Sequence, residues 1–340
     1  MVVIALSVAS IAAVSQLTID DNVYQYFPED HSFRQGTDLI DEHFSGSMQL
    51  VYSLDSGADF GVFDQQYVNR LNAFTTWLQA QSGVANVTSG GAILPTSESR
   101  LAKAQDFFEG SKSSDYGYQQ LISENYRSTK LLISLQGLTA NQLIAFENNT
   151  STWLRANLSV YEFSGGVGAD ILFAKLGEQN AKSLFVSLSL ALVFIALIIG
   201  VLLRSVKAMI IAVVCNGLPV ILVFAVWSLM GGYISLGSAM VMGMVIGIIV
   251  DDTLHLLFKY RSSENFSNSI ELIYLNVCPA IVVSSITLSL AFVVGFFSDF
   301  RPIYELSLLS FFIIVVAMVT DLLVLPALMK SLKYGVTTNE

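Results

Sequence analysis

Long apolar runs fill the C-terminal half of the chain, whereas polar and apolar positions alternate over short distances in the N-terminal half. The change occurs near Lys182. A helix needs about 20 predominantly apolar residues to cross a hydrocarbon layer about 30 Å thick. Five runs reach this length, at residues 183–203, 206–230, 235–258, 277–298 and 303–328. The pattern therefore predicts a bundle of five membrane-spanning helices over residues 183–330, followed by a short tail at 331–340.

A sixth apolar run, at residues 1–14, has the character of a spanning helix but not its length. The length suits the apolar core of a signal peptide. However, no Lys or Arg precedes the run, and signal peptides begin with a positively charged segment. We therefore favour the outer part of a first membrane helix that is truncated in this sequence. The expected fold class is a membrane α-helical bundle of six spans, the first of them truncated.

Residues 15–182 predict a separate domain of mixed α and β structure. Alternating apolar positions predict strands at 48–54, 84–89, 130–136 and 160–163, and apolar spacings of three or four residues predict helices at 64–81 and 139–157. Two successive β-α-β units of this kind suggest a small α+β ferredoxin-like sandwich. The stretch 90–127 between them predicts a long connection. From Ala169 onward a helical pattern runs directly into the bundle.

Composition supports a membrane protein and narrows its function. Hydrophobic residues make up 53% of the chain and charged residues 13%, with a mean hydropathy of +0.61, whereas soluble domains carry about 25% charged residues. The net charge of −10 argues against nucleic acid as a partner, because phosphate binding needs clustered Lys and Arg. Two cysteines and three histidines argue against a zinc site, and no nucleotide-binding loop or hydrolase motif occurs. We expect no cofactor, no metal and no enzymatic activity.

Lys and Arg in the short loops predict the orientation, because positively charged loops stay in the cytoplasm. The loops at one end of the spans share six cations: Arg204, Lys207, Lys259, Arg261, Lys330 and Lys333. The opposite loops, at 231–234 and 299–302, contain only Arg301. The tail is therefore expected in the cytoplasm, and residues 15–182 outside it. An interfacial aromatic belt is expected from tyrosines at the span ends: Tyr233, Tyr260, Tyr274 and Tyr304.

Three ionisable residues interrupt the run at 235–258, and they are the main candidates for function. They are Asp251, Asp252 and His255. An acid at the centre of a membrane helix costs roughly 2.5–3.5 kcal/mol on insertion scales, so these side chains are not expected to face lipid. At about 100° per residue, Asp251 and His255 share one helix face and Asp252 points elsewhere. Gly243 and Gly247 extend the first face, where they would let a neighbouring helix pack closely.

Such a cluster suits a proton relay. Burial and a like-charged neighbour favour the protonated form of a carboxyl group, whereas a nearby cation favours the ionised form. A carboxyl group between these influences can take up a proton on one side of a membrane and release it on the other. The alternative is a hydrogen-bonded polar clamp that holds the bundle together. We favour a relay formed by Asp251, Asp252 and His255, because ionisable residues inside membrane helices are by default a functional hypothesis.

Hydroxyl groups in the run at 277–298 are possible relay partners. Ser285 and Thr287 lie in a polar patch of this run, together with Ser284 and Ser289. Ser and Thr are also common where membrane helices simply pack together. The two interpretations have equal weight at these positions.

Two acids in the last run, at 303–328, are the remaining candidates. With a rise of 1.5 Å per residue, the depth of Asp321 from the outer end of its helix matches the depths of Asp252 and His255, so contact between them is expected. Asp321 could equally be a half-solvated residue near the cytoplasmic end. Glu305 lies only two residues past the outer end, which predicts an interfacial position.

Several stretches of the sequence carry a family resemblance. The stretch 247–255 (GIIVDDTLH) resembles the fourth-span signature of RND-superfamily exporters of the MMPL type. The stretch 298–306 (SDFRPIYEL) looks like their loop between the fifth and sixth spans, and 320–328 (TDLLVLPAL) resembles their last helix. The segments 17–22 (LTIDDN) and 26–30 (YFPED) are similar to the start of their porter domain. Together these stretches cover nearly the whole chain.

The resemblance implies an exporter of lipids or other hydrophobic molecules that is driven by the proton-motive force. It places the bundle in the inner (cell) membrane of a bacterium and the porter domain in the periplasm. It also implies that Asp251, and with it Asp252, carries the coupling proton. Family members usually contain two such halves in one chain, whereas this sequence holds one, and its short first run suggests the C-terminal half. The expected partner is a second RND half or another copy of this chain.

Two other functions fit part of the pattern. A SecD/SecF-like accessory of protein translocation has the same six-span layout and also uses an intramembrane acid. Sterol-sensing domains share the Gly-x-x-x-Asp pattern found at Gly247 and Asp251, so a lipid-sensing module without transport is the other alternative. We favour the exporter because the stretches 298–306 and 320–328 resemble it best.

Overall fold

The computed structural model describes residues 2–43, 46–94, 103, 121–158, 161–261, 275 and 277–332. The chain divides into two compact units. The bundle unit comprises Met1–Asp21, Gln25–Pro28 and Gly177–Glu340, and the sheet unit comprises Asn22–Tyr24 and Glu29–Leu176. The boundary near Gly177 falls inside helix α6 (Ala169–Leu202), so one continuous helix belongs to both units. The helical pattern predicted from Ala169 into the first run of the bundle is therefore confirmed.

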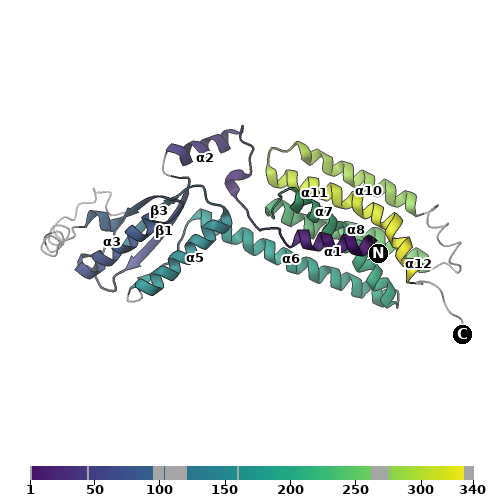
Figure 1. Ribbon diagram of the computed structural model, residues 1–340, viewed down its shortest axis with the longest axis horizontal. Coiled ribbons are helices and arrows are strands. Elements are labelled where there is room, and N and C mark those ends of the chain that lie inside the picture. Colours follow the sequence, from purple (N-terminus) through teal and green to yellow (C-terminus); the bar gives the residue numbers. More distant parts are fainter. Residues whose placement is uncertain are drawn as a thin grey trace. The chain divides into compact units, whose positions relative to one another are not determined.

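Helices make up the described part of the bundle unit (Figure 1). They are α1 (Val2–Val14), α6, α7 (Val206–Leu229), α8 (Leu236–Arg261), α10 (Cys278–Val293), α11 (Arg301–Val319) and α12 (Leu325–Ser331). A 3-10 turn, Val294–Phe297, extends α10, and a π-helical segment, η6 (Thr320–Val324), joins α11 to α12. Among the described residues, five helices, with these extensions, are long and apolar enough to cross a membrane. They coincide with the five predicted runs, whereas α1 has only 13 residues.

Capping residues and prolines set several helix ends. Ser205 caps α7, because its hydroxyl oxygen accepts a hydrogen bond from the Ala208 N–H at 3.3 Å. Pro279 and Pro302 lie in the first turns of α10 and α11, where the missing N–H has no helical partner to lose. Pro326 occupies the corresponding position of α12, directly after the π-helical segment. The sequence thus marks where each of these helices begins.

Helix α11 packs against α7, α8 and α10 and lies at the centre of the bundle unit. The buried core includes Phe224 of α7, Leu257 of α8 and Ile313 of α11, each at most 1% exposed. By contrast, large apolar side chains cover the outer surface, and Val201 and Phe297 are 77% and 85% exposed. Such a surface is unfavourable in water and favourable among lipid tails, so the bundle unit belongs in a membrane.

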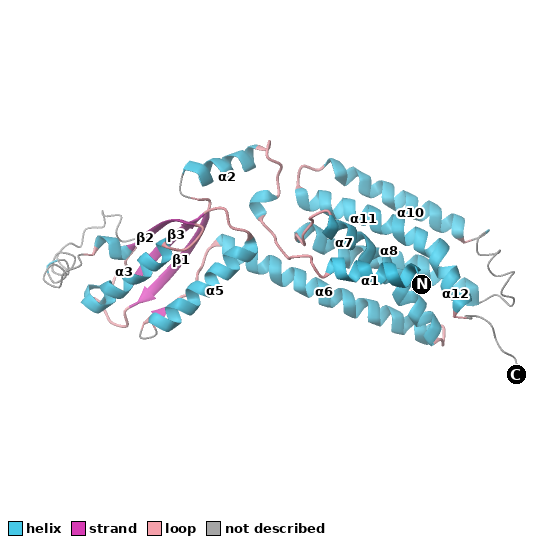
Figure 2. Ribbon diagram, in the orientation of Figure 1, coloured by secondary structure: helices cyan, strands magenta, loops and turns pink. Residues whose placement is uncertain are grey.

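A four-stranded antiparallel sheet forms the sheet unit (Figure 2). Its strands are β1 (Met48–Asp55), β2 (Val84–Ser89), β3 (Ser128–Leu135) and β4 (Glu162–Phe163), in the spatial order β2-β3-β1-β4. The central strands β1 and β3 pair along their full length, with Leu50 opposite Ile133. The first three predicted strands are confirmed to within two residues. At 160–163 the strand is only two residues long, and Val160 lies outside the described residues.

Helices α3 (Gln65–Gln79) and α5 (Ala140–Asn157) share one hydrophobic core with this sheet. Trp153 of α5 stacks against both Phe74 and Trp77 of α3, with ring centroids 5.2 Å apart in each pair. Both helices match the predictions from apolar spacing. The unit also contains α2 (Ser32–His43) and the 3-10 turns Gly61–Phe63 and Gly90–Ile93, and a further 3-10 turn, Val23–Gln25, spans residues of both units.

Only the two ends of the predicted connection 90–127, together with residue 103, fall within the described residues. At the first end, Ser89 caps the 3-10 turn through the Gly91 N–H at 3.0 Å. At the second end, Ile122 forms an isolated antiparallel bridge with Thr129 of β3. Both ends are thus fixed to the sheet unit, and the prediction for the rest of the stretch lies outside the described residues.

Candidate functional site

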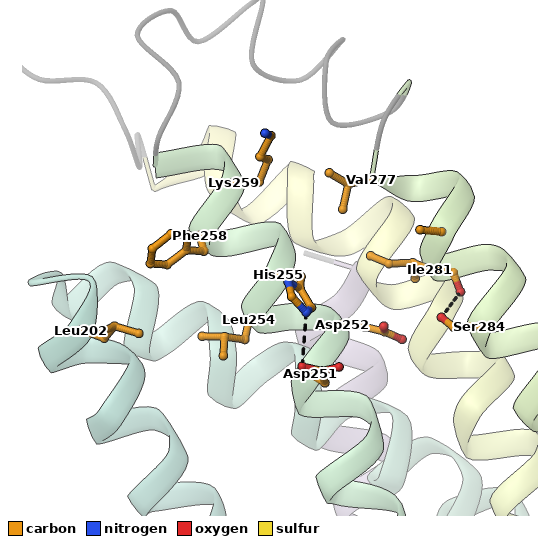
Figure 3. A pocket seen from close by; sticks show the side chains of 11 residues that line it. Leu202, Asp251, Asp252, Leu254, His255, Phe258, Lys259, Val277, Ile281 and Ser284 are labelled. Carbon is orange, nitrogen blue, oxygen red and sulfur yellow. Dashed lines mark hydrogen bonds and ion pairs between the residues drawn. The ribbon is translucent and has the colours of Figure 1, made fainter.

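An open cleft in the bundle unit contains the three candidate residues of α8, Asp251, Asp252 and His255. It has a volume of about 680 Å³ and lies between α8 and α10, with the end of α6 at its edge (Figure 3). The lining residues are Leu202, Asp251, Asp252, Leu254, His255, Phe258, Lys259, Val277, Ala280, Ile281 and Ser284. Five of these side chains are polar or charged, those of Asp251, Asp252, His255, Lys259 and Ser284, and the others are apolar. The three ionisable residues that interrupt the predicted span at 235–258 therefore line a single cleft.

Asp251 and His255 lie one turn apart on the same face of α8. The Nε2 atom of His255 is 3.5 Å from Oδ1 of Asp251, and each side chain is 70% exposed. The two groups attract each other as an ion pair only when the imidazole is protonated. No helix in the described ranges covers this pair. Because lipid tails do not solvate charge, another protein surface or water has to cover it in a membrane.

Asp252 points to a different neighbour. Its Oδ2 atom accepts a hydrogen bond from the hydroxyl of Ser285 on α10 at 3.4 Å. Ser285 is 2% exposed, whereas the side chain of Asp252 lies between the buried and exposed classes. Figure 3 shows Asp252 directed toward α10 and Asp251 turned away from it. The two neighbouring acids therefore occupy different surroundings.

Asp321 is buried in the bundle, and its contact with α8 runs through Thr253. The Thr253 hydroxyl lies 2.9 Å from Oδ1 of Asp321, and no bond joins Asp321 to His255. The same hydroxyl lies 3.3 Å from Oδ1 of Asn216 on α7. With 2% exposure, Asp321 is not half-solvated, so that alternative is wrong for this chain. The depth argument found the correct level of α8 but not the residue in contact.

Three other candidate positions lie apart from these contacts. Thr287 is exposed, and its hydroxyl donates to the carbonyl of Val283 in its own helix at 2.7 Å. A Cβ atom added at Gly247 would meet nothing within 4 Å, and one added at Gly243 would meet only Leu184, at 3.8 Å. Among the described residues, no helix packs closely at these two glycines, because their face of α8 is exposed.

Glu305, which was expected at the membrane interface, lies near the start of α11 and is enclosed by protein. The residue is 1% exposed, because Arg301 and the hydroxyl of Ser235 both bind its carboxylate inside the bundle unit. Tyr260, expected in an aromatic belt, is 3% exposed and belongs to the bundle core. Tyr274 lies outside the described residues.

Two residues of the buried contacts, Thr253 and Asn216, were not predicted from the sequence. Asn216 carried a signal, since it is an amide in the middle of an otherwise apolar run, whereas a Thr beside two acids is inconspicuous. Within the described ranges, no group of three or more His, Cys, Asp or Glu side chains could hold a metal ion. The arrangement can nevertheless accept and release protons, because an imidazole and two carboxylates line one open cleft.

No protein-family model matches the chain, and no curated protein matches it. Two features distinguish the site. One is the uncovered pair of Asp251 and His255 on a membrane-spanning helix, and the other is the difference in surroundings between Asp251 and Asp252.

Proposed function

We propose that this chain is one half of an exporter that uses the proton-motive force to move lipids or other hydrophobic molecules. The observation that carries the proposal is the pair of Asp251 and His255 in an open cleft of an apolar bundle. Ionisable groups are expensive in a membrane and persist there mainly where they serve transport or proton transfer. The resemblance of the stretches 247–255, 298–306 and 320–328 to RND exporters of the MMPL type supports the same function.

In this proposal the proton occupies the cleft acids in turn. His255 can share a proton with Asp251 across 3.5 Å, and Asp252 is the next carboxylate along the helix. The Ser285 hydroxyl holds Asp252 toward α10, so movement of α10 relative to α8 would change the stability of its charged form. This coupling of proton uptake to helix movement is what a proton-driven transporter requires.

The uncovered face of α8 supports an assembly with a second half or with another copy of the chain. Asp251, His255 and the two glycines before them all lie on this face. A partner helix packed there would cover the charges and would use the glycines for the close approach that this chain alone does not show. We propose that the assembly lies in a bacterial inner membrane.

We also propose that the sheet unit is a ferredoxin-like porter domain in the periplasm. Its order along the chain, β1-α3-β2-β3-α5-β4, with the spatial order β2-β3-β1-β4, supports two interlocked β-α-β units. The Lys and Arg residues of the short loops support a position of this domain on the side of the membrane opposite to the cytoplasm. The chain would then combine a membrane bundle with a domain that receives the substrate outside it.

Gradient-driven movement of a lipid tests the proposed function. We would load vesicles carrying the chain with a fluorescent phospholipid and impose a proton gradient. Asp251→Asn is expected to abolish the movement that depends on the gradient, while the variant inserts and unfolds at the normal temperature. Asp299→Asn, the same change at an exposed loop acid outside the cleft, should keep it. Transport by Asp251→Asn at the normal rate would exclude the relay.

An apolar groove favours a second candidate, a lipid-sensing module without transport. The groove has a volume of about 400 Å³ and lies between α7 and α11, with Trp227 and Tyr304 among its lining residues. Its size and apolar lining suit an acyl chain or a sterol. Such a module would bind the fluorescent phospholipid equally well with and without a proton gradient, and would not move it.

A further inference from the structure

One buried hydroxyl proton in the bundle unit is surrounded by three acceptors. The Thr253 hydroxyl lies 2.9 Å from Oδ1 of Asp321, 3.3 Å from Oδ1 of Asn216 and 3.4 Å from the carbonyl oxygen of Ile249. A Thr hydroxyl has a single proton to donate. One N–H of the Asn216 amide donates to the carbonyl of Ala212 at 2.8 Å, and no described hydrogen bond joins Nδ2 to Thr253 or Asp321. The single Thr253 proton is therefore shared by three acceptors.

Burial makes this imbalance costly. Thr253 and Asn216 are each 1% exposed, and Asp321 is 2% exposed. An ionised carboxylate away from water needs a compensating positive charge, and acceptor oxygens without donors lose their hydration. Neither Lys nor Arg is bonded to these three side chains in the described contacts. A bound cation would compensate the charge of the carboxylate and would also be coordinated by the acceptor oxygens.

The helix beside Asp321 adds a further acceptor. In the π-helical segment the Leu325 N–H donates to the carbonyl of Thr320, five residues back. Residue 326 is a proline, which has no N–H. Consequently neither residue 325 nor residue 326 donates to the backbone carbonyl of Asp321. Carbonyls released at irregular turns of membrane helices are known ligands of Na⁺, and π-helical turns often occur at functional sites.

We propose that Asp321, Thr253 and Asn216 bind a sodium ion. All three offer hard oxygen ligands, which suit this ion. A single carboxylate in the cluster matches a single positive charge, whereas a divalent ion would leave an uncompensated charge in apolar surroundings. Three acceptor oxygens lie within 2.9–3.4 Å of the Thr253 hydroxyl, so the potential ligands are gathered in one place.

Asp252 lies near both the cleft and this site. Asp252 lines the cleft, and its charge interacts with that of Asp321. A cation in the cleft would thus be attracted first by Asp252 and then by Asp321. The site is separate from the proposed proton relay, because Asp251 and His255 lie on the opposite, uncovered face of α8 and make no bond to it in the described contacts.

Labelling of two buried thiols measures binding without any transport. Cys215 and Cys278 are free, buried and close enough to Asp321 to interact with its charge. We would heat the purified full chain with a thiol-reactive fluorophore in NaCl, KCl or choline chloride at equal ionic strength. Binding to the folded state alone raises the unfolding temperature with ligand concentration. We expect NaCl to raise the temperature of labelling above that in the other two salts.

Matched variants decide between a sodium site and a general salt effect. Asp321→Asn and Thr253→Val should lose the sodium-dependent shift, and Thr253→Ser should keep it because the hydroxyl is retained. Loss of a ligand should weaken the affinity for Na⁺ by about tenfold or more. Asp251→Asn should keep the shift, so that a failed proton relay and a failed sodium site give different results. Equal temperatures in all three salts, or an unchanged shift in Asp321→Asn and in Thr253→Val, would overturn the proposal.

Discussion

The guanidinium of Arg301 lies 2.7 Å from the carboxylate of Glu305, one turn further along α11. The Glu305 side chain is 1% exposed and that of Arg301 40% exposed. The Tyr233 ring lies 4.9 Å from the guanidinium carbon, so Arg301 also makes a cation–π contact. Its backbone N–H donates to the carbonyl of Tyr26 at 2.7 Å. Arg301 thus joins three segments of the bundle unit while compensating a buried charge.

Replacing Arg301 by Ala is expected to destabilise the bundle unit. Removing one partner of a buried ion pair costs roughly 3–5 kcal/mol, and the partial exposure of Arg301 predicts the lower end of that range. The unfolding temperature of the purified chain, followed by labelling of its buried thiols, measures the effect. Arg261→Ala, at an exposed end of α8, is the control and should change little. Equal unfolding temperatures for the two variants would contradict a stabilising role of the pair.

The position of Glu305 shows where sequence reasoning reached its limit. Counting residues from the end of an apolar run gave its depth, but depth alone does not tell which side of a helix faces a neighbour. The lengths of the apolar runs, by contrast, predicted α7 and α8 to within three residues at each end. Run length depends on the chain itself, whereas burial of a single side chain depends on segments distant in sequence, here the loop that carries Ser235.

Packing at glycines gives a second prediction. Close packing was expected at Gly247, whereas the structure shows it at Gly237. A Cβ atom at Gly237 would overlap the backbone of Pro302, whereas one at Gly247 would meet nothing within 4 Å. Gly237→Ala should therefore lower the unfolding temperature. Gly247→Ala should leave it unchanged or raise it slightly, since Ala favours a helix by about 1 kcal/mol over Gly. The two variants carry the same chemical change, so each serves as the control of the other.

An ion pair in the sheet unit predicts a pH dependence of stability. Arg127 Nε lies 2.8 Å from Oδ1 of Asp55, and the Gly57 N–H donates to the same carboxylate at 2.7 Å. Partial burial raises the pKa of Asp55, but these hydrogen bonds outweigh it and hold the pKa below its ordinary value. A depressed pKa stabilises the folded state above the unfolded-state pKa of about 3.9, and this contribution is lost as the pH falls through the folded-state value.

Asp55→Asn should therefore unfold at a lower temperature than the unmodified chain at pH 7. The difference should disappear well below pH 4, where Asp55 is protonated in both states of the unmodified chain. Asp59→Asn replaces a nearby acid that takes part in no ion pair among the described residues. Its unfolding temperature should differ less from that of the unmodified chain at both pH values. Thermal unfolding followed by tryptophan fluorescence measures the sheet unit in a chain with Trp227 of α7 replaced by Phe, because Trp77 and Trp153 both lie in that unit. A constant difference between pH 7 and pH 3 would show that the carboxylate charge has no part in it.

The buried contacts of Thr253, Asn216 and Asp321 show a second feature that the sequence did not predict. Asp321 stood out because an acid inside an apolar run is rare, but its partner was expected among the acids and the histidine of α8. The actual contact is Thr253, which lies between Asp252 and His255 along the chain and faces the other way. The rotation of α8 about its axis decides which of these neighbours meets α7 and the last helix. That rotation depends on core contacts with residues distant in sequence, such as those of Leu257 and Ile249, which the local pattern does not specify.

The uncovered face of α8 predicts a protein partner in the membrane. Gly247 lies on this face, one turn before Asp251, with open space around it. In a chain with Cys215 and Cys278 replaced by Ala, Gly247→Cys should form a disulfide-linked product in membranes under mild oxidation. A product of twice the mass of the chain would identify a second copy, and a different mass would identify a separate half. Val201→Cys, on a highly exposed position of α6, controls for random collisions. Cross-linking of Gly247→Cys no more efficient than that of Val201→Cys would contradict the proposed assembly, because the pair of Asp251 and His255 would then remain uncovered by protein.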